Sequence, residues 1–371
     1  MELASFINDL QTVVNIDCGT HNIAGVTKVA AYMEQKYKKL GWHAEQVDLG
    51  AKVGKGLFVT NKPGAERFDV LLVGHLDTVF ADGTAAERPF TIKDNMAYGP
   101  GVTDMKAGII SMYYALAELA SEHQERLAIA VGLNPDEEVG SGSSTAWLTG
   151  LAKKSRYAML LEPSRGEGGK MVKARKGMAR YIFNFSGVAA HAGNAPEDGR
   201  SAIHEMANWI LALLNLADQA KGTTTNIGLV SGGEAANIVA DKATCALDVR
   251  YWDNADYDRL TRAIDAMLAT TFTPDITIRM ERTAYLPAMF PTPQSEAFMK
   301  LVERCGDEIG VKVIWTEAGG GGDGNHIAPT GTPVLDGFGP TGGNMHSPKE
   351  FLEIDSIVPR TKLVRRIIES L

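Results

Sequence analysis

The stretch FDVLLVGHLD, residues 68–77, decides the fold, because an almost unbroken apolar run ends there at His75 and Asp77. Short apolar runs bounded by turn residues are typical of strands buried on both faces, as in a parallel sheet. In open α/β sheets, ligands bind beyond the carboxyl ends of such strands. The stretch therefore predicts a buried parallel strand that brings His75 to the ligand-binding edge of a sheet.

Two more runs have the same form. Residues 127–133 lead into the acidic turn NPDEE, residues 134–138, and residues 157–161 lead into Glu162. Because the carboxyl ends of parallel strands meet at one edge of a sheet, we expect the histidine and these carboxylates to gather there. Such a cluster favours a pair of divalent metal ions, and it points to a metal-dependent hydrolase.

The composition indicates an ordinary globular protein. With 371 residues, 44% of them apolar and 22% charged, two domains are expected. The net charge of -8 and the absence of a basic stripe argue against a nucleic-acid or membrane partner. One small basic cluster favours a solvated loop over substrate contacts: Lys170, Lys173, Arg175, Lys176 and Arg180.

Three scattered cysteines, Cys18, Cys245 and Cys305, show no CxxC spacing and imply no disulfide framework. The N-terminal residues do not resemble a signal peptide, and no apolar stretch approaches the roughly 20 residues of a membrane helix. These features predict a cytoplasmic location, or a periplasmic one if an export signal has been removed.

Strands and helices alternate up to about residue 174, which is the pattern of an α/β layer fold. Helical spacing of apolar residues predicts helices at 26–40 and 106–120. Asp104 therefore lies near the N-terminus of the second helix.

The pattern changes after residue 174. Strands are predicted at 179–185, 225–230, 238–251 and 276–282, and helices at 200–216 and 255–269. This β-α-β-β-α-β order is that of a ferredoxin-like domain. A helix at 295–308 and a strand at 311–315 follow. We therefore predict a doubly wound, mostly parallel-sheet catalytic domain, residues 1–174 and 285–371, interrupted by a satellite domain at 175–284.

Six residues are candidates for the metal site: His75, Asp104, Glu137, Glu138, Glu162 and His346. Imidazole nitrogen and carboxylate oxygen are both ligands that Zn²⁺ accepts. For any one of them alone, a surface charge or a core histidine is the better interpretation. Burying all these carboxylates together requires a cation, so the set favours a metal site.

Several of these residues lie in motifs that resemble the M20 metallopeptidases. The matching blocks are GHLDTV (74–79), YGPGVTDMKAG (98–108), PDEEVGS (135–141), LLEP (160–163), HAG (191–193) and GGNMHS (342–347). They cover nearly the whole chain in order. The run DGFG at 336–339 and the glutamate at position 162 are most similar to the glutamate carboxypeptidase branch of that family.

The resemblance implies a dinuclear zinc site, in which cobalt or manganese can substitute. Asp104 would bridge the two ions, with His75 and Glu162 completing one shell and Glu138 and His346 the other. Asp77 would hold the His75 ring from behind. Glu137 would be the general base that takes a proton from the water bridging the metals. The family pattern also implies a cis peptide bond between Asp104 and Met105.

Further roles follow from the resemblance. His191 would reach the active site across a dimer interface of the satellite domain and stabilise the oxyanion, unless it is an ordinary loop histidine. Asn237 and Arg250 would contact the amide and the free carboxylate of the substrate, although an ion pair with a nearby acid is the alternative for Arg250.

The loop at residues 319–324 formally contains GxGxxG, but the helix of a dinucleotide site does not follow it. The resemblance instead implies that backbone amides of this loop, at Gly320 and Gly321, receive the terminal carboxylate of the substrate.

The leading hypothesis is a zinc-dependent exopeptidase that removes a C-terminal residue, with glutamate as one candidate, from a peptide or acyl conjugate. The main alternative is an N-acyl-amino-acid deacylase of the acetylornithine deacetylase or succinyl-diaminopimelate desuccinylase type, and a dipeptidase is a weaker one. A metal-free binding homologue is the competing non-enzymatic hypothesis, against which the intact ligand set and Glu137 argue.

Overall fold

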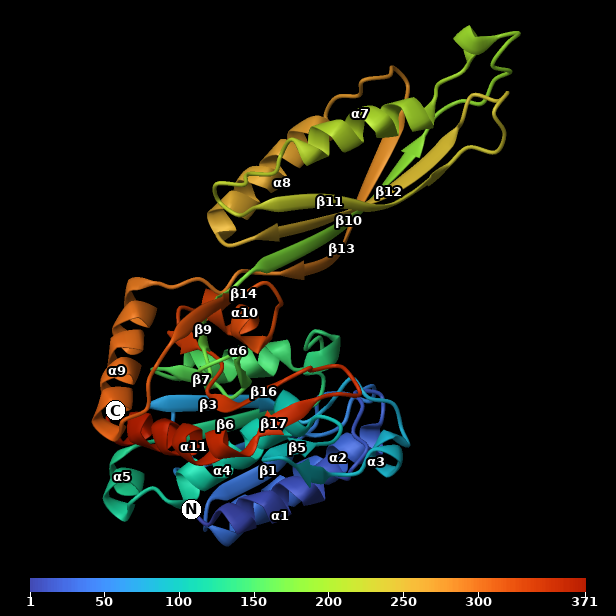
Figure 1. Cartoon of the computed structure of the whole chain (residues 1–371). Coiled ribbons are helices and arrows are strands. Elements are labelled where there is room, and N and C mark those ends of the chain that lie inside the picture. The colour runs from blue at the N-terminus through green and yellow to red at the C-terminus, as the bar shows by residue number, and fades with distance from the viewer. The chain divides into compact units, whose positions relative to one another are not determined.

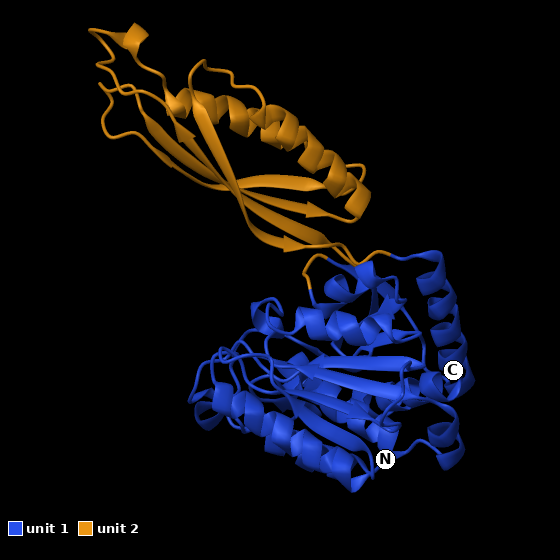
Figure 2. Ribbon diagram, turned by 180° about the vertical axis from the view of Figure 1, so that it is seen from behind, with its two compact units in different colours: residues 1–174, 291–318, 322–371 blue, residues 175–290, 319–321 orange.

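The computed structural model describes all 371 residues, which divide into two compact units (Figure 2). The large unit comprises residues 1–174, 291–318 and 322–371, and the small unit comprises residues 175–290 and 319–321. The return boundary lies later than the expected position after residue 284, because the last strand of the small unit continues to Leu286, which pairs with Met178.

The main sheet of the large unit has the strand order β1-β2-β6-β3-β7-β15. Its strands are β1 (His43–Val47), β2 (Gly56–Thr60), β3 (Val70–His75), β6 (Ile129–Asn134), β7 (Ala158–Leu160) and β15 (Val334–Leu335). The four strands β6, β3, β7 and β15 run parallel, and β2 is antiparallel to its neighbours. Every residue of β3 and β6 is buried, as the unbroken apolar runs predict.

Helices cover both faces of this sheet, which makes the unit doubly wound. The helices are α1 (Leu3–Val14), α2 (Ile23–Lys39), α3 (Thr84–Glu87), α4 (Ala107–Ala117), α5 (Ser121–Arg126), α6 (Thr145–Lys153), α9 (Pro293–Ile309), α10 (Asp323–Ile327) and α11 (Ile354–Glu369). In Figure 1, α6 and α10 lie on one face, and α2 and α4 lie on the other. The expected fold class is therefore confirmed.

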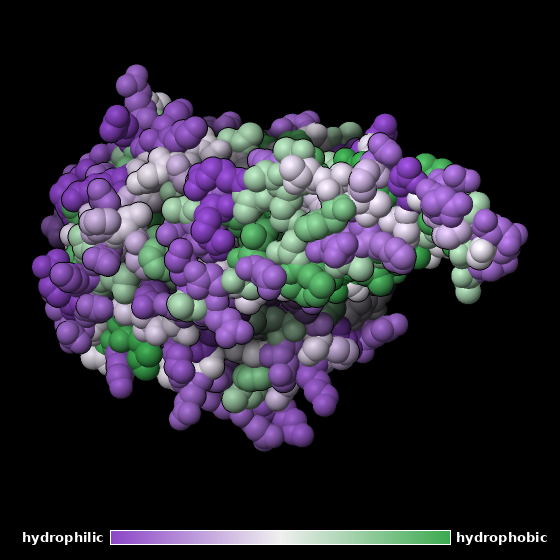
Figure 3. Space-filling model, turned by 90° about the horizontal axis from the view of Figure 1, so that it is seen from above, coloured by the Kyte–Doolittle hydropathy of each residue, from purple (hydrophilic) through white to green (hydrophobic).

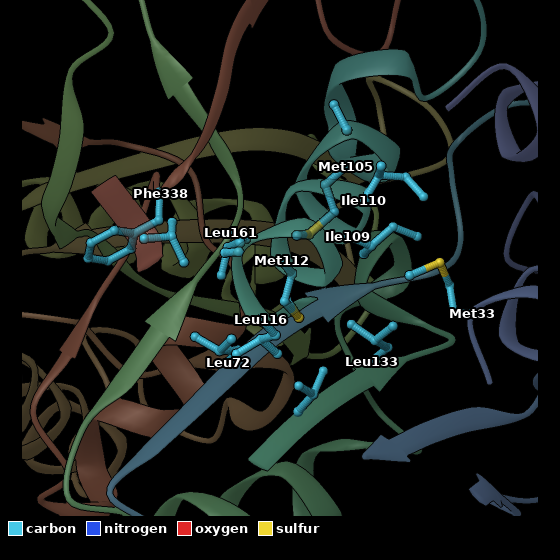
Figure 4. Packing of buried hydrophobic residues seen from close by; sticks show 14 of the residues in the cluster. Met33, Leu72, Met105, Ile109, Ile110, Met112, Leu116, Leu133, Leu161 and Phe338 are labelled. Atoms are coloured by element: carbon cyan, nitrogen blue, oxygen red, sulfur yellow. The ribbon is translucent and has the colours of Figure 1, made fainter. Parts of the chain in front are cut away.

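The core between α4 and the sheet fixes the N-terminal end of α4. Figure 4 shows Ile109, Met112 and Leu116 of α4 packed beside Leu72 of β3 and Leu133 of β6. All five side chains are buried, and burying each contributes about 1.5–3 kcal/mol. This packing holds the residues just before α4 close to the carboxyl ends of β3 and β6.

A second, smaller sheet has the order β4-β5-β17-β16-β8, and two more strands pair as β14-β9. The strands are β4 (Thr91–Lys93), β5 (Met96–Tyr98), β8 (Pro163–Arg165), β9 (Met171–Arg175), β14 (Trp315–Ala318), β16 (Gly339–Gly343) and β17 (Phe351–Glu353). The strand expected at 311–315 begins only at Trp315, because Val311 N–H instead donates to the carbonyl of Gly306 and closes the end of α9.

The small unit has the expected β-α-β-β-α-β order. Its elements are β10 (Gly177–Ser186), α7 (Ala202–Leu214), β11 (Thr224–Gly232), β12 (Lys242–Tyr251), α8 (Asn254–Leu268) and β13 (Thr277–Leu286). The antiparallel sheet has the order β11-β12-β10-β13, and both helices lie on one face of it (Figure 1). Trp209 of α7 packs against Phe183 and Phe185 of β10, with ring centroids 5.4 and 6.0 Å apart.

Strand β12 begins later than the expected residue 238. Val239 N–H donates to the carbonyl of Ala190, and the carbonyl of Ala240 accepts from Ala202 at the start of α7. These bonds bind residues 238–240 to a loop and a helix instead of to the sheet. None of the helices in either unit has both the length and the apolar character needed to cross a membrane.

Candidate metal centre

Three adjacent strands bring the candidate residues to one edge of the main sheet. Strand β3 lies between β6 and β7, and His75 at its end pairs with Asn134 at the end of β6. The turn with Glu137 and Glu138 follows β6, and Glu162 follows β7. The three runs picked out in the sequence are therefore neighbours in the sheet, and all end at its carboxyl edge.

Asp104 faces an imidazole with each of its two oxygens. His75 Nε2 lies 3.2 Å from Asp104 Oδ1 and 3.5 Å from Glu162 Oε1. His346 Nε2 lies 3.2 Å from Asp104 Oδ2 and 3.1 Å from Glu138 Oε2. The structure thus groups the five expected ligands into two sets that share Asp104.

The spacing of these atoms and the burial of all but His346 fit a divalent metal ion. Ligand atoms about 2.1 Å from a tetrahedral zinc ion lie about 3.4 Å from one another, and the separations here are 3.1–3.5 Å. Glu138 Oε1 is buried and has no hydrogen-bond partner, which is costly unless a cation satisfies it. Donor atoms of His75, Asp104 and Glu138 all lie within 4.8 Å of one another.

Glu137 has surroundings that suit a proton acceptor. Its carboxylate, His75 and Glu162 offer atoms within 4.8 Å of one another, whereas Glu138 groups with His75 and Asp104. Burial raises the pKa of Glu137 well above its usual value, and the nearby carboxylates of Glu162 and Asp323 raise it further. A raised pKa brings a carboxylate closer to the range in which it exchanges protons near neutral pH.

The two histidines lower the pKa of Asp104, and Asp104 in turn raises the pKa of both histidines. Burial raises the pKa of Asp104, but hydrogen bonds with His346 and His75 outweigh that effect and hold it below its usual range. Hydrogen bonds to Asp104 and Glu138 raise the pKa of His346 to about 10. The carboxylates around these rings therefore favour positive charge at this site, and a bound cation would supply it.

The peptide bond between Asp104 and Met105 is cis, as the family pattern predicts. The surrounding turn, Val102–Lys106, is held by Glu350, a residue that the sequence did not reveal. Glu350 accepts hydrogen bonds from the backbone N–H groups of Gly101, Thr103 and Asp104, at 3.0, 2.8 and 3.0 Å. Its only sequence signal is its position four residues after His346.

Asp77 does more than orient the imidazole of His75. His75 Nδ1 lies 3.0 Å from the backbone carbonyl oxygen of Asp77 and 3.4 Å from its Oδ1, so the closer contact is to the backbone. The Asp77 carboxylate also accepts from the backbone N–H groups of Glu137 and Glu138, both at 3.2 Å. The same side chain therefore contacts the histidine and holds the turn with the proposed base.

The turn Glu137–Val139 is short and tightly bonded at both ends. Gly140 and Ser141 follow it with φ of +94° and +55°, a region that non-glycine residues such as Ser141 rarely adopt. Asp136 accepts hydrogen bonds from the Ser143 backbone and the Ser144 hydroxyl, at 2.7 and 2.6 Å. These bonds fix the direction in which each of the two adjacent glutamates points.

The remaining predicted residues belong to the small unit. His191 is exposed, and its Nδ1 accepts from the backbone N–H groups of Gly193 and Asn194, both at 3.1 Å. The exposed Asn237 lies beside it, because its carbonyl accepts from Ala192 N–H at 3.0 Å. Both residues are therefore positioned by the same pair of loops.

Arg250 forms an ion pair with a nearby acid, which was the alternative to a substrate contact for this residue. Its Nε donates to Asp248 Oδ1 at 2.8 Å. The buried Arg175 donates to the carbonyls of Gly320 and Gly321, at 3.2 and 3.1 Å. The basic cluster in the sequence therefore includes one residue that is not solvated, and Arg175 orients the peptide groups of the glycine-rich loop.

A hollow of about 670 Å³ borders Glu138 in the large unit. Thr20, His21, Val79, Phe80 and Val139 line it together with neighbouring residues. Val79 and Val139 are 43% and 57% exposed, so apolar surface lies open beside the cluster. The cluster is therefore accessible to a molecule of substrate size.

Residues 71–370 match the model of the peptidase family M20/M25/M40, and the chain belongs to this family. It is therefore a metal-dependent hydrolase. Among its relatives, it is 30% identical to carboxypeptidase G2 of Pseudomonas sp. (strain RS-16), over 100% of this chain and 90% of that protein. It is 27% identical to the succinyl-diaminopimelate desuccinylase of Psychrobacter arcticus, over 89% of this chain and 83% of that enzyme.

Solved structures share the two-unit fold. The aminopeptidase PepT of Bacillus cereus matches 100% of this chain and 98% of its own with a TM-score of 0.79 and 24% identity. The metallo-carboxypeptidase Sso-CP2 of Sulfolobus solfataricus matches 98% of each chain with a TM-score of 0.67 and 17% identity. At these identities the likeness establishes the fold alone.

Proposed function

We propose that the protein is a dizinc exopeptidase that hydrolyses the amide bond next to a C-terminal residue of a peptide or acyl conjugate. The observation that carries this proposal is the pair of imidazoles on the two oxygens of Asp104, with the carboxylate of Glu137 beside them. His75 and Glu162 would hold one ion, Glu138 and His346 the other, and Asp104 both. Bound zinc would acidify a water molecule and polarise the scissile carbonyl.

Glu137 is the proposed general base. It takes a proton from the attacking water and passes it to the leaving nitrogen, as the position of its carboxylate beside the ligand cluster allows. Its raised pKa supports this role, because the protonated form can then act as the acid in the second step. Asp77 keeps the base in place through the backbone of the turn.

The small unit supplies the other proposed contacts. Since His191 Nδ1 accepts two backbone hydrogen bonds, its ring proton lies on Nε2, where it can donate to an oxyanion. Gly320, Gly321, Asn237 and Arg250 would bind the terminal carboxylate and the amide. For Arg250 this requires exchange of Asp248 for the substrate carboxylate, which offers the same two acceptor oxygens.

A homodimer through the small unit is part of the proposal. Strand β11 is an edge strand, and Leu229 and Val230 on it are 73% and 59% exposed. Leu211 and Leu214 on α7 are 64% and 41% exposed. An open edge with exposed apolar side chains favours pairing with a second chain. Figure 3 shows green apolar surface between purple hydrophilic side chains on one face of the molecule.

A deacylase is the second candidate, because the similarity to succinyl-diaminopimelate desuccinylases extends over most of the chain. Both reactions cleave an amide beside a free carboxylate, so the same cluster serves either. We place the enzyme in the cytoplasm, where its three buried cysteines would remain reduced.

Hydrolysis of a substrate panel tests the proposal. Zinc-loaded protein would be assayed on N-benzoyl-glutamate, peptidyl-glutamates, N-succinyl and N-acetyl amino acids and dipeptides. We expect the highest kcat/KM on N-benzoyl-glutamate or a peptidyl-glutamate, and none on the corresponding carboxamide. Highest activity on N-succinyl-diaminopimelate or N-acetylornithine would select the deacylase, and highest activity on free dipeptides would contradict both.

A further inference from the structure

We propose that Asp323 is a positioning residue for the base, because its carboxylate joins the two ends of the turn that carries Glu137. The inference rests on the proposed function, in which Glu137 is the general base. The Asp323 carboxylate bonds to Asn134 and Ser141 and does not line the hollow beside Glu138, so these hydrogen bonds affect the reaction through the turn. Its charge has a separate effect, because it raises the pKa of Glu137.

The two ends of the turn are Asn134, the last residue of β6, and Ser141. Asp323 Oδ2 accepts from Asn134 Nδ2 at 2.6 Å, and Asp323 Oδ1 accepts from Ser141 Oγ at 2.5 Å. All three side chains are at most 2% exposed. The single buried carboxylate of Asp323 therefore links the two ends of the segment that carries both glutamates, in addition to the bonds that Asp77 and Asp136 make within it.

A carboxylate is the side chain that this position requires. Two donors approach from opposite ends of the turn, and a carboxylate has an acceptor oxygen for each. An asparagine in the same place would keep both bonds only if Asn134 also turned its unpartnered amide oxygen toward it. Otherwise its own NH₂ group opposes that of Asn134, or Ser141 is left without an acceptor. Burial raises the pKa of Asp323 to about 6, so keeping the group ionised there costs stability. Residues that cost stability are common where function needs them.

Asp323 also lies at a second functional position. It directly follows the glycine-rich residues 319–322 and begins the short helix α10. Gly322 N–H donates to Asn325 Oδ1 at 3.0 Å, which ties the end of that loop to the same helix. The segment proposed to receive the substrate carboxylate and the turn with the base are thus connected through α10.

Variants of this connection test the inference, with kcat measured at saturating zinc so that weaker metal binding does not contribute. We expect Asp323→Asn and Ser141→Ala to lower kcat by about 10–100-fold, as loss of a supporting partner does at other metal sites. KM should change less than kcat, because the groups proposed to contact the substrate are unchanged.

Ser111→Ala is the matched control. Ser111 is also a fully buried serine, and its hydroxyl bonds to Thr361 at 2.8 Å, away from the turn. We expect Ser111→Ala and Ser141→Ala to lower Tm by similar amounts, whereas only Ser141→Ala lowers kcat. Equal kcat in the two variants and in the unchanged protein would overturn the inference, as would full recovery of kcat by excess zinc.

A double variant that exchanges the amide and the carboxylate between positions 134 and 323 tests whether kcat can be restored. In the double variant Asn134→Asp with Asp323→Asn, the amide at position 323 can donate to the new carboxylate and accept from Ser141. We expect its kcat to exceed that of Asp323→Asn by about tenfold, because the connection is restored with reversed polarity. A folded double variant that is no faster than Asp323→Asn would overturn the inference.

Glu137→Gln separates this inference from the proposed function. If Glu137→Gln keeps full kcat, the base is wrongly assigned and the proposed function fails. If Glu137→Gln is inactive while Asp323→Asn and Ser141→Ala keep full kcat, only the positioning role of Asp323 is wrong.

Discussion

At the scale of single residues, Glu137 and Glu138 are adjacent in the chain but differ in what they contact. Glu138 Oε2 faces His346 at 3.1 Å, whereas Glu137 lies near His75 and Glu162. The hydrogen bonds of Asp77 to both backbone N–H groups separate the two side chains. One glutamate is therefore available as a ligand and the other as a base.

Glu137→Gln should separate these roles. Glutamine keeps the shape of the side chain but cannot take the proton, so we expect kcat to fall at least about 10²-fold. Zinc content should stay near that of the unchanged protein. Glu138→Ala should instead lose metal, because it removes a carboxylate that faces His346. Elemental analysis and steady-state kinetics of both variants measure the difference, and full turnover by Glu137→Gln would refute the assignment.

Glu350→Gln should weaken metal binding although Glu350 is not a ligand. Its two oxygens accept three backbone hydrogen bonds around Asp104, and a glutamine would turn an NH₂ group toward one of these donors. We expect the zinc affinity to fall about 10–100-fold, measured by competition with a chelator. The nearby acid Glu353 gives the control, and equal affinity in Glu350→Gln and Glu353→Gln would show that Glu350 does not support Asp104.

Sequence reasoning picked out the residues that form the cluster and one support, Asp77, but not the supports Glu350 and Asp323, and the reason is physical. His75, Glu137 and Glu162 each follow an apolar strand, so a local pattern marks them. Glu350 and Asp323 act on backbone or side chains that lie far away in sequence. No local periodicity marks such contacts, because they exist only after the sheet has brought the segments together.

At the scale of elements, continuous apolar runs predicted where strands occur, but the sequence did not predict where each strand begins and ends. Buried β3 and β6 have continuous apolar sequences, so their existence and their shared edge could be predicted. The strand expected at 311–315 begins only at Trp315, because the end of α9 takes up the backbone N–H of Val311. A helix end competes with a strand for the same donor, and propensity does not decide between them.

Asp256 of helix α8 should make the stability of the small unit depend on pH in the acidic range. Asp256, 3% exposed in its first turn, has a pKa held below its usual range by hydrogen bonds from Arg259, Thr223 and Lys221. A depressed folded pKa stabilises the fold above the unfolded value of about 3.9, and this contribution is lost as pH falls toward the folded pKa.

Asp256→Asn tests this dependence. At neutral pH we expect a loss of about 1.5–3 kcal/mol in unfolding free energy, because charge-assisted hydrogen bonds are removed. The difference in Tm between this variant and the unchanged protein should shrink below about pH 4. Asp258→Asn, an exposed acid on the same helix, is the control. A Tm difference that stays constant from pH 7 to pH 3 would contradict the assignment.

At the scale of the whole molecule, the candidate metal ligands and the proposed substrate contacts lie in different units. The ligand cluster belongs to the large unit, and His191, Asn237 and Arg250 belong to the small unit. The small unit has its own core and its own open edge strand, β11. We propose that this unit joins two chains and that His191 of one chain completes the site of the other.

Subunit complementation tests that proposal. His191→Ala and Glu137→Gln should each be nearly inactive, since one removes the oxyanion donor and the other the base. If His191 of each chain reaches the site of its partner, a mixed dimer has one site with both residues intact and one site with neither. With random exchange at equal concentrations, half of the dimers are mixed, so we expect about a quarter of the unchanged activity. Subunit exchange would be verified with chains of different mass. A mixture that exchanges fully but stays as inactive as its parents would show that His191 does not act on the partner's site.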